Sequence, residues 1–517
     1  MADSRTSNVI KNSGASLLNK LVHMLVQFGM RTVFIYFLGN EYTGVSSLFT
    51  DILQVLSLME LGLDTSMIYS LYGPLARQDH QRISALMNFY RKAFTVIGFA
   101  VLGAGLLCVP FLQYIVKGVP NIKEDIRGIF LMYVATSAFS YFLVYKTVLL
   151  RANQKSRIIS NWTTIIYVTE SIAEVILLLI FRAFYAYLIV HLLATVLRNI
   201  ILSRKTDKLY PDYVGKTEER LPREDRKALF RDLACLTVYS TAGVVIHSTD
   251  SIFISSFVGT VQVTIIGNHT LIINSIRHIV SQIVNTTKPS IGNLAATSDT
   301  EKQETVFYRM FFISFWVSCF TCTGLFVLLN PFVGDIWFNP SYKVSMVIIA
   351  VMVANYFIPV MGFPVESFRT ANGLFVQGWM RPAIMAALNL VLDYFLGRAW
   401  GIFGIFIATT ISRLATQTWY DPWLVHKKVF RKSPAQFFAK YGLYAAITAV
   451  SCFAVYELGN LISVSNRWIG FGTKLILVCL IPNLLVIALF RKTAEFEYTR
   501  NLMKKITGKI RKKVGKV

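Results

Sequence analysis

Charged side chains recur at helical spacing inside long apolar stretches of this sequence. Lys20 and Arg31 stand eleven positions apart, which is three turns of an α-helix, so they lie nearly in register on one helix face. Arginine binds phosphate through paired hydrogen bonds, and lysine binds it as a point charge. We therefore single out a set of residues that could bind an anion. Its cations are Lys20, Arg31, Arg277, Arg381 and Arg413, and the polar residues with them are His23, Gln27, Asn274 and Gln417.

A second set consists of carboxylates inside the apolar stretches. Glu170 and Glu174 are one helical turn apart, as are His247 and Asp250. A carboxylate removed from water can hold a proton or help to bind sodium. The alternative is that these groups pair with the cations, and the sequence leaves both interpretations open. The candidates for coupling or gating are Asp51, Asp64, Glu170, Glu174, His247 and Asp250.

The elements that carry both sets are apolar segments long enough to cross a membrane. Charged residues make up 15% of the chain and the mean hydropathy is +0.52, whereas about a quarter of the residues in soluble proteins are charged. A spanning helix needs about 20 mostly apolar residues. The sequence therefore predicts an all-α polytopic membrane protein with about fourteen helices. We place them at 13–38, 43–72, 92–116, 128–150, 158–181, 183–203, 229–258, 261–288, 308–334, 342–368, 372–397, 401–421, 437–460 and 470–490.

The embedded cations need an environment other than lipid. A charge at the centre of a bilayer costs roughly 2.5–3.5 kcal/mol, so many such residues cannot all face lipid. We expect the cationic faces to line a water-filled cavity, which would focus the electric field on an anionic group. The alternative is that some cations pair internally with Asp51, Glu170, Glu174 or Asp393.

The net charge of +24 is concentrated in short loops between the apolar segments. This placement favours interaction with anionic phospholipids and excludes a nucleic-acid partner from our expectations. About 36 of the Lys and Arg residues fall on one side of the predicted helices and about 8 on the other, so we expect both termini in the cytoplasm. The polar first residues and the long apolar run after them predict no cleavable signal peptide.

The sequence contains no pattern that we assign to catalysis, a metal or a cofactor. Cys319 and Cys322 have the spacing of a metal or redox pair, but they lie in an apolar helix beside Trp316 and Phe320, where small packing residues are expected. We therefore expect a protein that is not an enzyme and that has no cofactor, apart from coupling to a proton or sodium gradient.

A polar connector at 204–228 divides the chain into similar parts. We expect an N-terminal lobe of six helices at 1–203 and a C-terminal lobe of six helices at 229–425. Two further helices follow within 426–490, and a basic cytoplasmic tail occupies 491–517. The tripeptides Phe-Leu-Gly at 37–39 and Phe-Val-Gly at 257–259 end corresponding helices, which suggests two lobes related by an axis along the membrane normal.

The stretch YFLGNEYTGVSSLFTDILQVLSLMELGLDTS at 36–66 resembles the first-hairpin signature of Wzx-type oligosaccharide flippases. These belong to the multidrug/oligosaccharidyl-lipid/polysaccharide (MOP) exporter superfamily. The stretch 248–268 is similar to the seventh helix and turn of that family through Asp250 and Gly259, although 264–267 reads Thr-Ile-Ile-Gly where Gly-x-Tyr is more usual. The segment LLRANQKSRI at 149–158 resembles the loop between helices 4 and 5.

The resemblance implies a twelve-helix, two-lobed V with alternating access, plus two C-terminal helices that hold a polyprenyl tail. Related flippases use cavity cations to hold a diphosphate, a role that would fall here to Lys20, Arg31 and Arg277. The implied substrate is an undecaprenyl-diphosphate-linked oligosaccharide for capsule, O-antigen or exopolysaccharide. The implied location is the bacterial cytoplasmic membrane, with polysaccharide polymerase machinery as a further partner.

Three other functions remain as alternatives. The first is a cation-coupled multidrug exporter of the same fold, which the fourteen helices and the cationic faces disfavour. The second is a flippase for lipid II or a teichoic-type precursor. The third is a membrane scaffold or an integral glycosyltransferase, but a glycosyltransferase would need a carboxylate base in a large loop outside the membrane, and the predicted outer loops are short.

Overall fold

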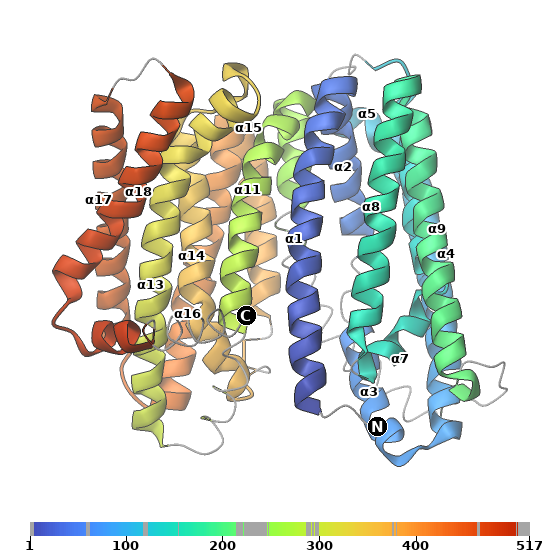
Figure 1. The fold of residues 1–517 in the computed structure, drawn as a ribbon, viewed down its shortest axis with the longest axis horizontal. Coiled ribbons are helices and arrows are strands. Elements are labelled where there is room, and N and C mark those ends of the chain that lie inside the picture. The colour runs from blue at the N-terminus through green and yellow to red at the C-terminus, as the bar shows by residue number, and fades with distance from the viewer. Residues whose placement is uncertain are drawn as a thin grey trace, which may run out of the picture. The chain divides into compact units, whose positions relative to one another are not determined.

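The computed structural model consists of helices throughout the part of the chain that it describes (Figure 1). That part comprises residues 5–57, 63–116, 122–153, 155–213, 221, 244, 246, 248–285, 291, 294, 299–374, 377–378, 380–462, 466–502 and 504, without the side chains of 5–18, 63–66, 69, 76 and 282–285. The chain forms two compact units, unit 1 (Met1–Thr264) and unit 2 (Ile265–Val517). The predicted connector at 204–228 lies mostly outside the described residues, so the predicted domain boundaries stay a prediction.

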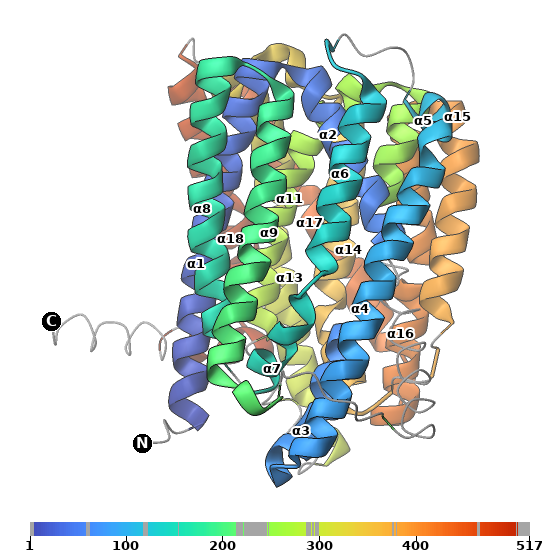
Figure 2. The ribbon, with the colours of Figure 1, turned by 90° about the vertical axis from the view of Figure 1, so that its right-hand side faces the viewer.

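In unit 1, long helices pack side by side in the order α1, α8, α9, α6 and α4 (Figure 2). An aromatic core that includes Phe34, Phe49, Phe130 and Phe184, each of which is buried, joins α1, α2, α6 and α9. The helices are α1 (Arg5–Leu38), α2 (Asn40–Leu56), α3 (Leu63–Arg77), α4 (His80–Cys108), α5 (Leu112–Ile115), α6 (Ile126–Tyr141), α7 (Thr147–Ala152), α8 (Ser156–Phe181) and α9 (Phe184–Leu209), with short turns η2 (Val109–Phe111), η3 (Val144–Lys146) and η4 (Pro211–Tyr213).

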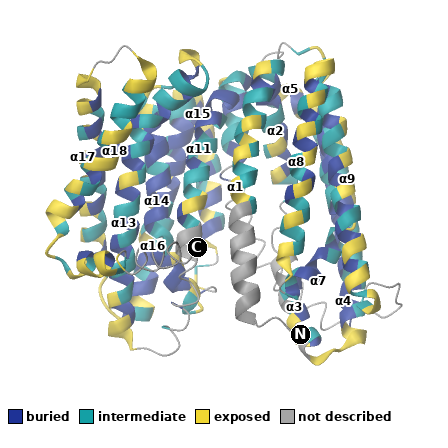
Figure 3. Cartoon of the chain, in the orientation of Figure 1, coloured by how far each residue is buried: buried dark blue, intermediate teal, exposed yellow. Residues whose placement is uncertain are grey.

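In unit 2, α13 packs against α14, α17 and α18. Burial is greatest along α13 and α14, whereas α17 and α18 show many exposed residues (Figure 3). The helices are α11 (Thr260–Asn285), whose first turn belongs to unit 1, α13 (Thr300–Pro331), α14 (Met346–Ala371), α15 (Arg381–Ala415), α16 (Gln417–Val425), α17 (Ala435–Leu461) and α18 (Arg467–Phe490), with η5 (Phe332–Trp337), η6 (Pro340–Tyr342) and η7 (His426–Phe430).

The element α15 contains a chain reversal at Gly401. The backbone of Gly401 has φ 59° and ψ −134°, a conformation outside the helical region. Residues twenty positions apart in a straight helix are about 30 Å apart. Yet Asn389 Nδ2 donates to Thr409 Oγ1 at 3.3 Å, so the halves of α15 before and after Gly401 lie side by side. This reversal corresponds to the two helices that the sequence predicts at 372–397 and 401–421.

Ten segments of the described chain are long and apolar enough to cross a membrane, by length and composition. One of them, Arg381–Phe430, includes both halves of α15. Exposed large apolar side chains cover the outer helix faces, for example Leu107 on α4, Ile180 on α8 and Phe453 on α17. Such faces suit a hydrocarbon environment. The predicted class, an all-α polytopic membrane protein, is confirmed.

Several predicted helix boundaries are wrong. The segment 43–72, predicted as one helix, contains α2 ending at Leu56 and α3 beginning at Leu63. Helix α4 begins at His80 instead of 92, because Asp79 accepts a hydrogen bond from the backbone N–H of Arg82 and Ile83 packs against α3. Likewise, α13 begins at 300 instead of 308. Helices extend beyond the apolar span wherever capping and packing continue, so hydropathy alone places their ends poorly.

The predicted helix 128–150 also ends early, since α6 stops at Tyr141 and Leu143 adopts φ 71°. Buried Asn199 on α9 compensates for this break. Its Nδ2 donates to the carbonyl oxygens of Phe139 at 3.1 Å, Ser140 at 2.9 Å and Phe142 at 3.0 Å. Backbone groups released by a broken helix need such partners inside a membrane.

Candidate functional site

Helix α1 carries the first group of predicted site residues in unit 1. Lys20 and Gln27 are exposed, and His23 and Arg31 are partly buried. The ring of His23 stacks on Tyr167 of α8, with ring centroids 4.2 Å apart and planes 10° from parallel. The predicted polar face of α1 therefore contains two residues that are freely accessible and two that contact neighbouring elements.

Arg31 connects three parts of unit 1. Its Nη1 donates to Ser47 Oγ of α2 at 3.1 Å, and its Nη2 donates to the carbonyl oxygen of Thr264 at 3.2 Å. Thr264 in turn donates from Oγ1 to the carbonyl oxygen of Asn40 at 2.6 Å. Arg31 thus holds the start of α11 against the turn between α1 and α2, in addition to any role in anion binding.

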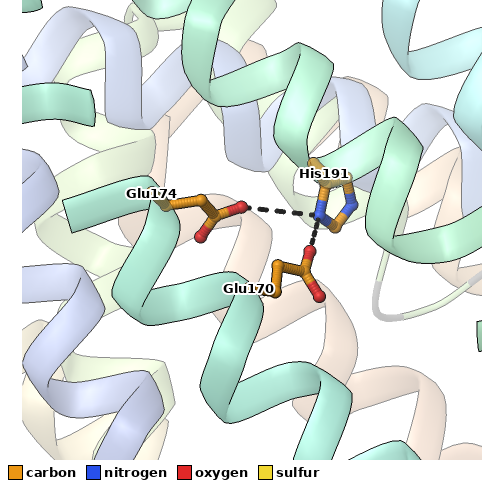
Figure 4. Close-up of side chains that lie close together, drawn as sticks. All are labelled: Glu170, Glu174 and His191. Carbon is orange, nitrogen blue, oxygen red and sulfur yellow. Dashed lines mark hydrogen bonds and ion pairs between the residues drawn. The ribbon is translucent and has the colours of Figure 1, made fainter. Parts of the chain in front are cut away.

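Two carboxylates and an imidazole meet between α8 and α9 (Figure 4). His191 Nδ1 is 2.5 Å from Glu170 Oε1 and 3.8 Å from Glu174 Oε1. The side chains of both glutamates are buried, and the three atoms lie within 4.8 Å of one another, which is close enough to share a small cation. The first distance is a hydrogen bond, whereas the second is within ion-pair range but too long for a hydrogen bond.

Glu170 and Glu174 are both predicted from the sequence, whereas His191 is a further residue that the structure adds. The feature of the sequence that could have identified His191 is its spacing from Arg198. The two basic residues are seven positions apart, so they share one face of an otherwise apolar helix. Arg198 interacts electrostatically with both Glu170 and His23. The polar face of α9 therefore meets the carboxylates of α8 and the histidine of α1.

The remaining predicted acidic residues of unit 1 lie apart from this cluster. Asp51 accepts a hydrogen bond from Ser251, and Ser248 donates to Gln54 Oε1 at 3.1 Å, so polar contacts join α2 to the helix before Gly259. Asp250 is partly buried in the same helix. His247 lies outside the described residues, as does the side chain of Asp64.

Helix α11 carries Asn274 and Arg277 in unit 2, and both are partly buried. Arg277 lies within electrostatic range of the Tyr356 hydroxyl of α14, which donates to Thr321 Oγ1 at 3.0 Å. The cations Lys20 and Arg31 belong to unit 1 and Arg277 belongs to unit 2. Their joint role in one cavity stays a prediction.

Arg381 and Arg413 take part in contacts inside unit 2. Arg413 Nη1 donates to the carbonyl oxygen of Asn355 at 2.8 Å. Arg381 Nε is 3.2 Å from Asp421 Oδ1, an ion-pair distance without a hydrogen bond, and the same oxygen accepts a hydrogen bond from Arg369 Nη1 at 3.1 Å. All of these charged side chains are buried. Internal pairing, the alternative considered for the cations, thus describes Arg381, although its partner is a carboxylate that the sequence analysis did not name.

Gln417 borders a hollow between α14, α16 and α17 that is also lined by Asp421 and Tyr441.

A separate oxygen-rich cluster joins the two halves of α15. Asn389 Nδ2 donates to Asp393 Oδ1 at 3.2 Å, while Asn389 Oδ1 and Asp393 Oδ2 have no hydrogen-bond partner among the described residues. Buried oxygen atoms of this kind suit a small hard cation such as sodium.

The similarity of this chain to known proteins lies in its fold. A scan against protein-family models finds no match, and a search of curated protein sequences finds no significant match. Solved structures do match. The lipid II flippase MurJ in an inward closed conformation superposes with a TM-score of 0.63 at 14% identity, covering 93% of this chain and 99% of that chain.

Two further solved structures are similar. An inward-facing multidrug resistance MATE family transporter of the MOP superfamily gives a TM-score of 0.54 at 13% identity, covering 78% of this chain and 95% of that chain. A MOP superfamily transporter from Pyrococcus furiosus, described as having a binding pocket of reverse polarity, gives 0.55 at 13% identity, covering 83% and 97%. The chain therefore has the two-lobed helical fold of MOP-superfamily membrane transporters.

Proposed function

We propose that this chain is a Wzx-type flippase of the MOP superfamily, which moves undecaprenyl-diphosphate-linked oligosaccharides across the bacterial cytoplasmic membrane by alternating access. Both termini lie in the cytoplasm, where anionic phospholipids contact the basic loops and tail. The protein is a transporter and performs no enzymatic reaction. Polysaccharide polymerase machinery receives the oligosaccharide after transport.

The main support for this proposal is the share of this chain that aligns with the lipid II flippase structure. That match covers 93% of the 517 residues and the MATE match covers 78%, a difference of about 78 residues. Helices α17 and α18 occupy Ala435–Phe490, which is 56 residues and could therefore make up most of this difference. A substrate with a long lipid tail supplies a reason for two additional helices, whereas a small drug supplies none.

The cationic residues supply the chemistry for the diphosphate. Lys20 is exposed on α1, and Arg31 and Arg277 are each partly buried. In the proposed mechanism these side chains face the hydrated interior and bind the diphosphate, with arginine forming paired hydrogen bonds. A proton or sodium gradient drives the cycle, with the buried carboxylates as the groups that exchange the cation.

The lipid tail requires an apolar surface at the side of the transporter. The outer faces of α17 and α18 present Val450, Phe453, Leu480 and Leu484, all exposed. Charged residues in these two helices lie near their ends, for example Lys440 and Lys474. We assign to this surface the polyprenyl tail, which remains in lipid while the sugar and diphosphate cross through the interior.

The proposal is tested in a bacterial strain whose surface polysaccharide depends on this chain. We expect Arg277→Ala to abolish surface polysaccharide and to cause lipid-linked precursor to accumulate on the cytoplasmic side, with unchanged protein abundance. Arg398→Ala, which removes an exposed arginine near the reversal of α15, is the control and leaves export intact. Normal surface polysaccharide in both Arg277→Ala and Arg31→Ala would falsify the diphosphate-binding role.

A second candidate is cation-coupled multidrug export, which the MATE likeness and the buried carboxylates favour. It is tested in the same strain by measuring drug sensitivity. If deletion of the chain leaves precursor distribution unchanged but increases the intracellular accumulation of cationic drugs, the second candidate replaces the first.

A further inference from the structure

We propose that Glu170, Glu174 and His191 form a proton-binding site in unit 1, in which the imidazole N–H of His191 bonds to whichever glutamate is ionised. The proposal rests on the proposed function, because a proton site inside a membrane transporter couples substrate movement to a proton gradient. It identifies His191 as the residue that connects the two carboxylates.

The geometry places one donor between two acceptors. Helix α8 presents Glu170 and Glu174 one turn apart, and α9 brings His191 to both. Nδ1 of His191 is 2.5 Å from Glu170 Oε1 and 3.8 Å from Glu174 Oε1. Because a single N–H makes one well-aligned hydrogen bond, only one of the two carboxylates can be its partner at a time.

Glu174 is the carboxylate without this hydrogen bond. Its side chain is 5% exposed, and its Oε1 has no hydrogen-bond partner in the described part of the chain. An ionised carboxylate with a buried oxygen that accepts no hydrogen bond is costly, and such a group neutralises by taking up a proton. The unpaired oxygen therefore marks where the proton resides when His191 bonds to Glu170.

The separation of the atoms favours a proton over a transition metal. Nitrogen and oxygen ligands lie about 2.0–2.2 Å from a bound zinc ion, so two ligands on one tetrahedral ion are more than about 3 Å apart. The His191 and Glu170 atoms are 2.5 Å apart, which is too close for two ligands of one such ion and places them in direct hydrogen-bond contact. The imidazole N–H accounts for this contact, and the exchangeable proton then resides on Glu174.

The charges that face the site support uptake of one proton. Arg198 is a neighbouring group with a permanent positive charge, and it interacts with Glu170, so the negative charge of Glu174 is left to be neutralised by a proton. The phenol groups around the site lose their protons only near pH 10 in their ordinary state. The titratable and charged groups that face the site are His23 of α1, Tyr133 of α6, Tyr167 of α8, and Tyr187 and Arg198 of α9.

Proton movement changes the contact between α8 and α9. When a proton binds Glu174, an O–H bond forms, that carboxyl becomes neutral, and the His191 N–H remains on Glu170. When the proton instead resides on Glu170, the N–H turns to Glu174, about 6 Å farther along α8. The His191 ring is 38% exposed and the two glutamates are not, so the proton enters and leaves past His191.

The site is tested on the purified full-length protein in detergent micelles, without transported substrate, by infrared difference spectroscopy between acidic and alkaline pH. We expect a C=O stretching band of a buried protonated carboxyl that is present at acidic pH and disappears as the pH rises. Glu174→Gln removes this band. The matched control is Asp207→Asn, which removes a carboxylate at the end of α9 that is paired with Lys146 and half-exposed, and which leaves the band intact.

Two further variants assign the titration to its residue. His191→Asn shifts the pH at which the band disappears, whereas His23→Asn shifts it less. The proposal is overturned if the band persists in Glu174→Gln, if His23→Asn produces the larger shift, or if sodium or zinc removes the band at constant pH. Because no transported substrate is needed, a normal titration in a protein without export activity counts against the proposed function alone. If the unmodified protein exports the substrate but the infrared band persists in Glu174→Gln, the result counts against this proton site and leaves the proposed function intact.

Discussion

Asp421 shows how a single residue determines the environment of two buried cations. Its carboxylate lies 3.1 Å from Arg369 Nη1 and 3.2 Å from Arg381 Nε, and the three side chains are each at most 8% exposed. The attraction between buried opposite charges offsets the large cost of removing them from water. At the residue scale, Arg381 therefore lies in an ion pair within this unit, while its predicted part in anion binding stays a prediction.

Asp421→Ala should destabilise unit 2 severely, because it leaves two arginines buried without their shared carboxylate. Breaking a buried ion pair by removing one partner costs about 3–5 kcal/mol. Thermal unfolding of the purified protein in micelles measures the effect, with Asp212→Ala as a control at an exposed carboxylate. Equal unfolding midpoints for the two variants would show that the arginines are stabilised by other groups.

At the scale of elements, the broken helix α6 depends on a side chain from another helix. Replacing Asn199 with leucine leaves the carbonyl groups of Phe139, Ser140 and Phe142 without their donor. We expect a loss of roughly 1–3 kcal/mol for each carbonyl left unpaired. Hydrogen exchange across 139–152 should increase selectively. The control is Asn161→Leu on the exposed face of α8. If this control variant also increased hydrogen exchange across 139–152 to the same extent, the capping role of Asn199 would be contradicted.

The segment after α18 offers a pH-dependent contact outside the membrane-spanning helices. Glu495 Oε1 is 2.8 Å from Lys440 Nζ, and the Phe496 ring stacks on Trp316 of α13 with centroids 5.4 Å apart. Burial raises the pKa of Glu495, but the hydrogen bond from Lys440 and the charges of Lys440 and Arg309 outweigh burial, and the pKa falls below the ordinary 4.5.

The sign of this pKa shift fixes the expected pH dependence. A carboxylate with a lowered pKa stabilises the docked segment above about pH 4.5, and the stabilisation is lost as the pH falls through the lowered value. We expect residues 491–502 to become accessible to an acid-active protease as the pH falls below 4.5 through the lowered pKa of Glu495. In Glu495→Gln they should be accessible at every pH. Cleavage that is independent of pH in the unmodified protein would rule out this contact as the attachment.

At the scale of the whole molecule, the proposed function assigns the lipid tail of the substrate to α17 and α18. They pack on α13 through Val327, Val455 and Val478. A chain that ends after Phe430 should still insert into the membrane but lose export of the lipid-linked substrate, while a chain that lacks only 505–517 exports normally. Surface polysaccharide measures the outcome. Full export by the shorter chain would remove the assignment of the lipid tail to these helices.

The sequence by itself determined the class of this protein and the identity of several buried charges. A membrane-spanning backbone must satisfy its own hydrogen bonds, so long apolar segments can only be helices, and the all-α class can be read from hydropathy. The same reasoning identified Glu170 and Glu174, because a charged residue inside an apolar segment is conspicuous, and it separated the two helices that meet at Gly401.

Only the tertiary structure decided which of these charged residues become partners. Glu170 and His191 are 21 positions apart, Arg381 and Asp421 are 40 apart, and Asn199 reaches carbonyls almost 60 positions earlier. Such pairs depend on the rotation and axial offset of each helix against its neighbour, which side-chain packing sets. The periodicity of a single helix shows which residues share its face, but it carries no information about the residue on the neighbouring helix that this face meets.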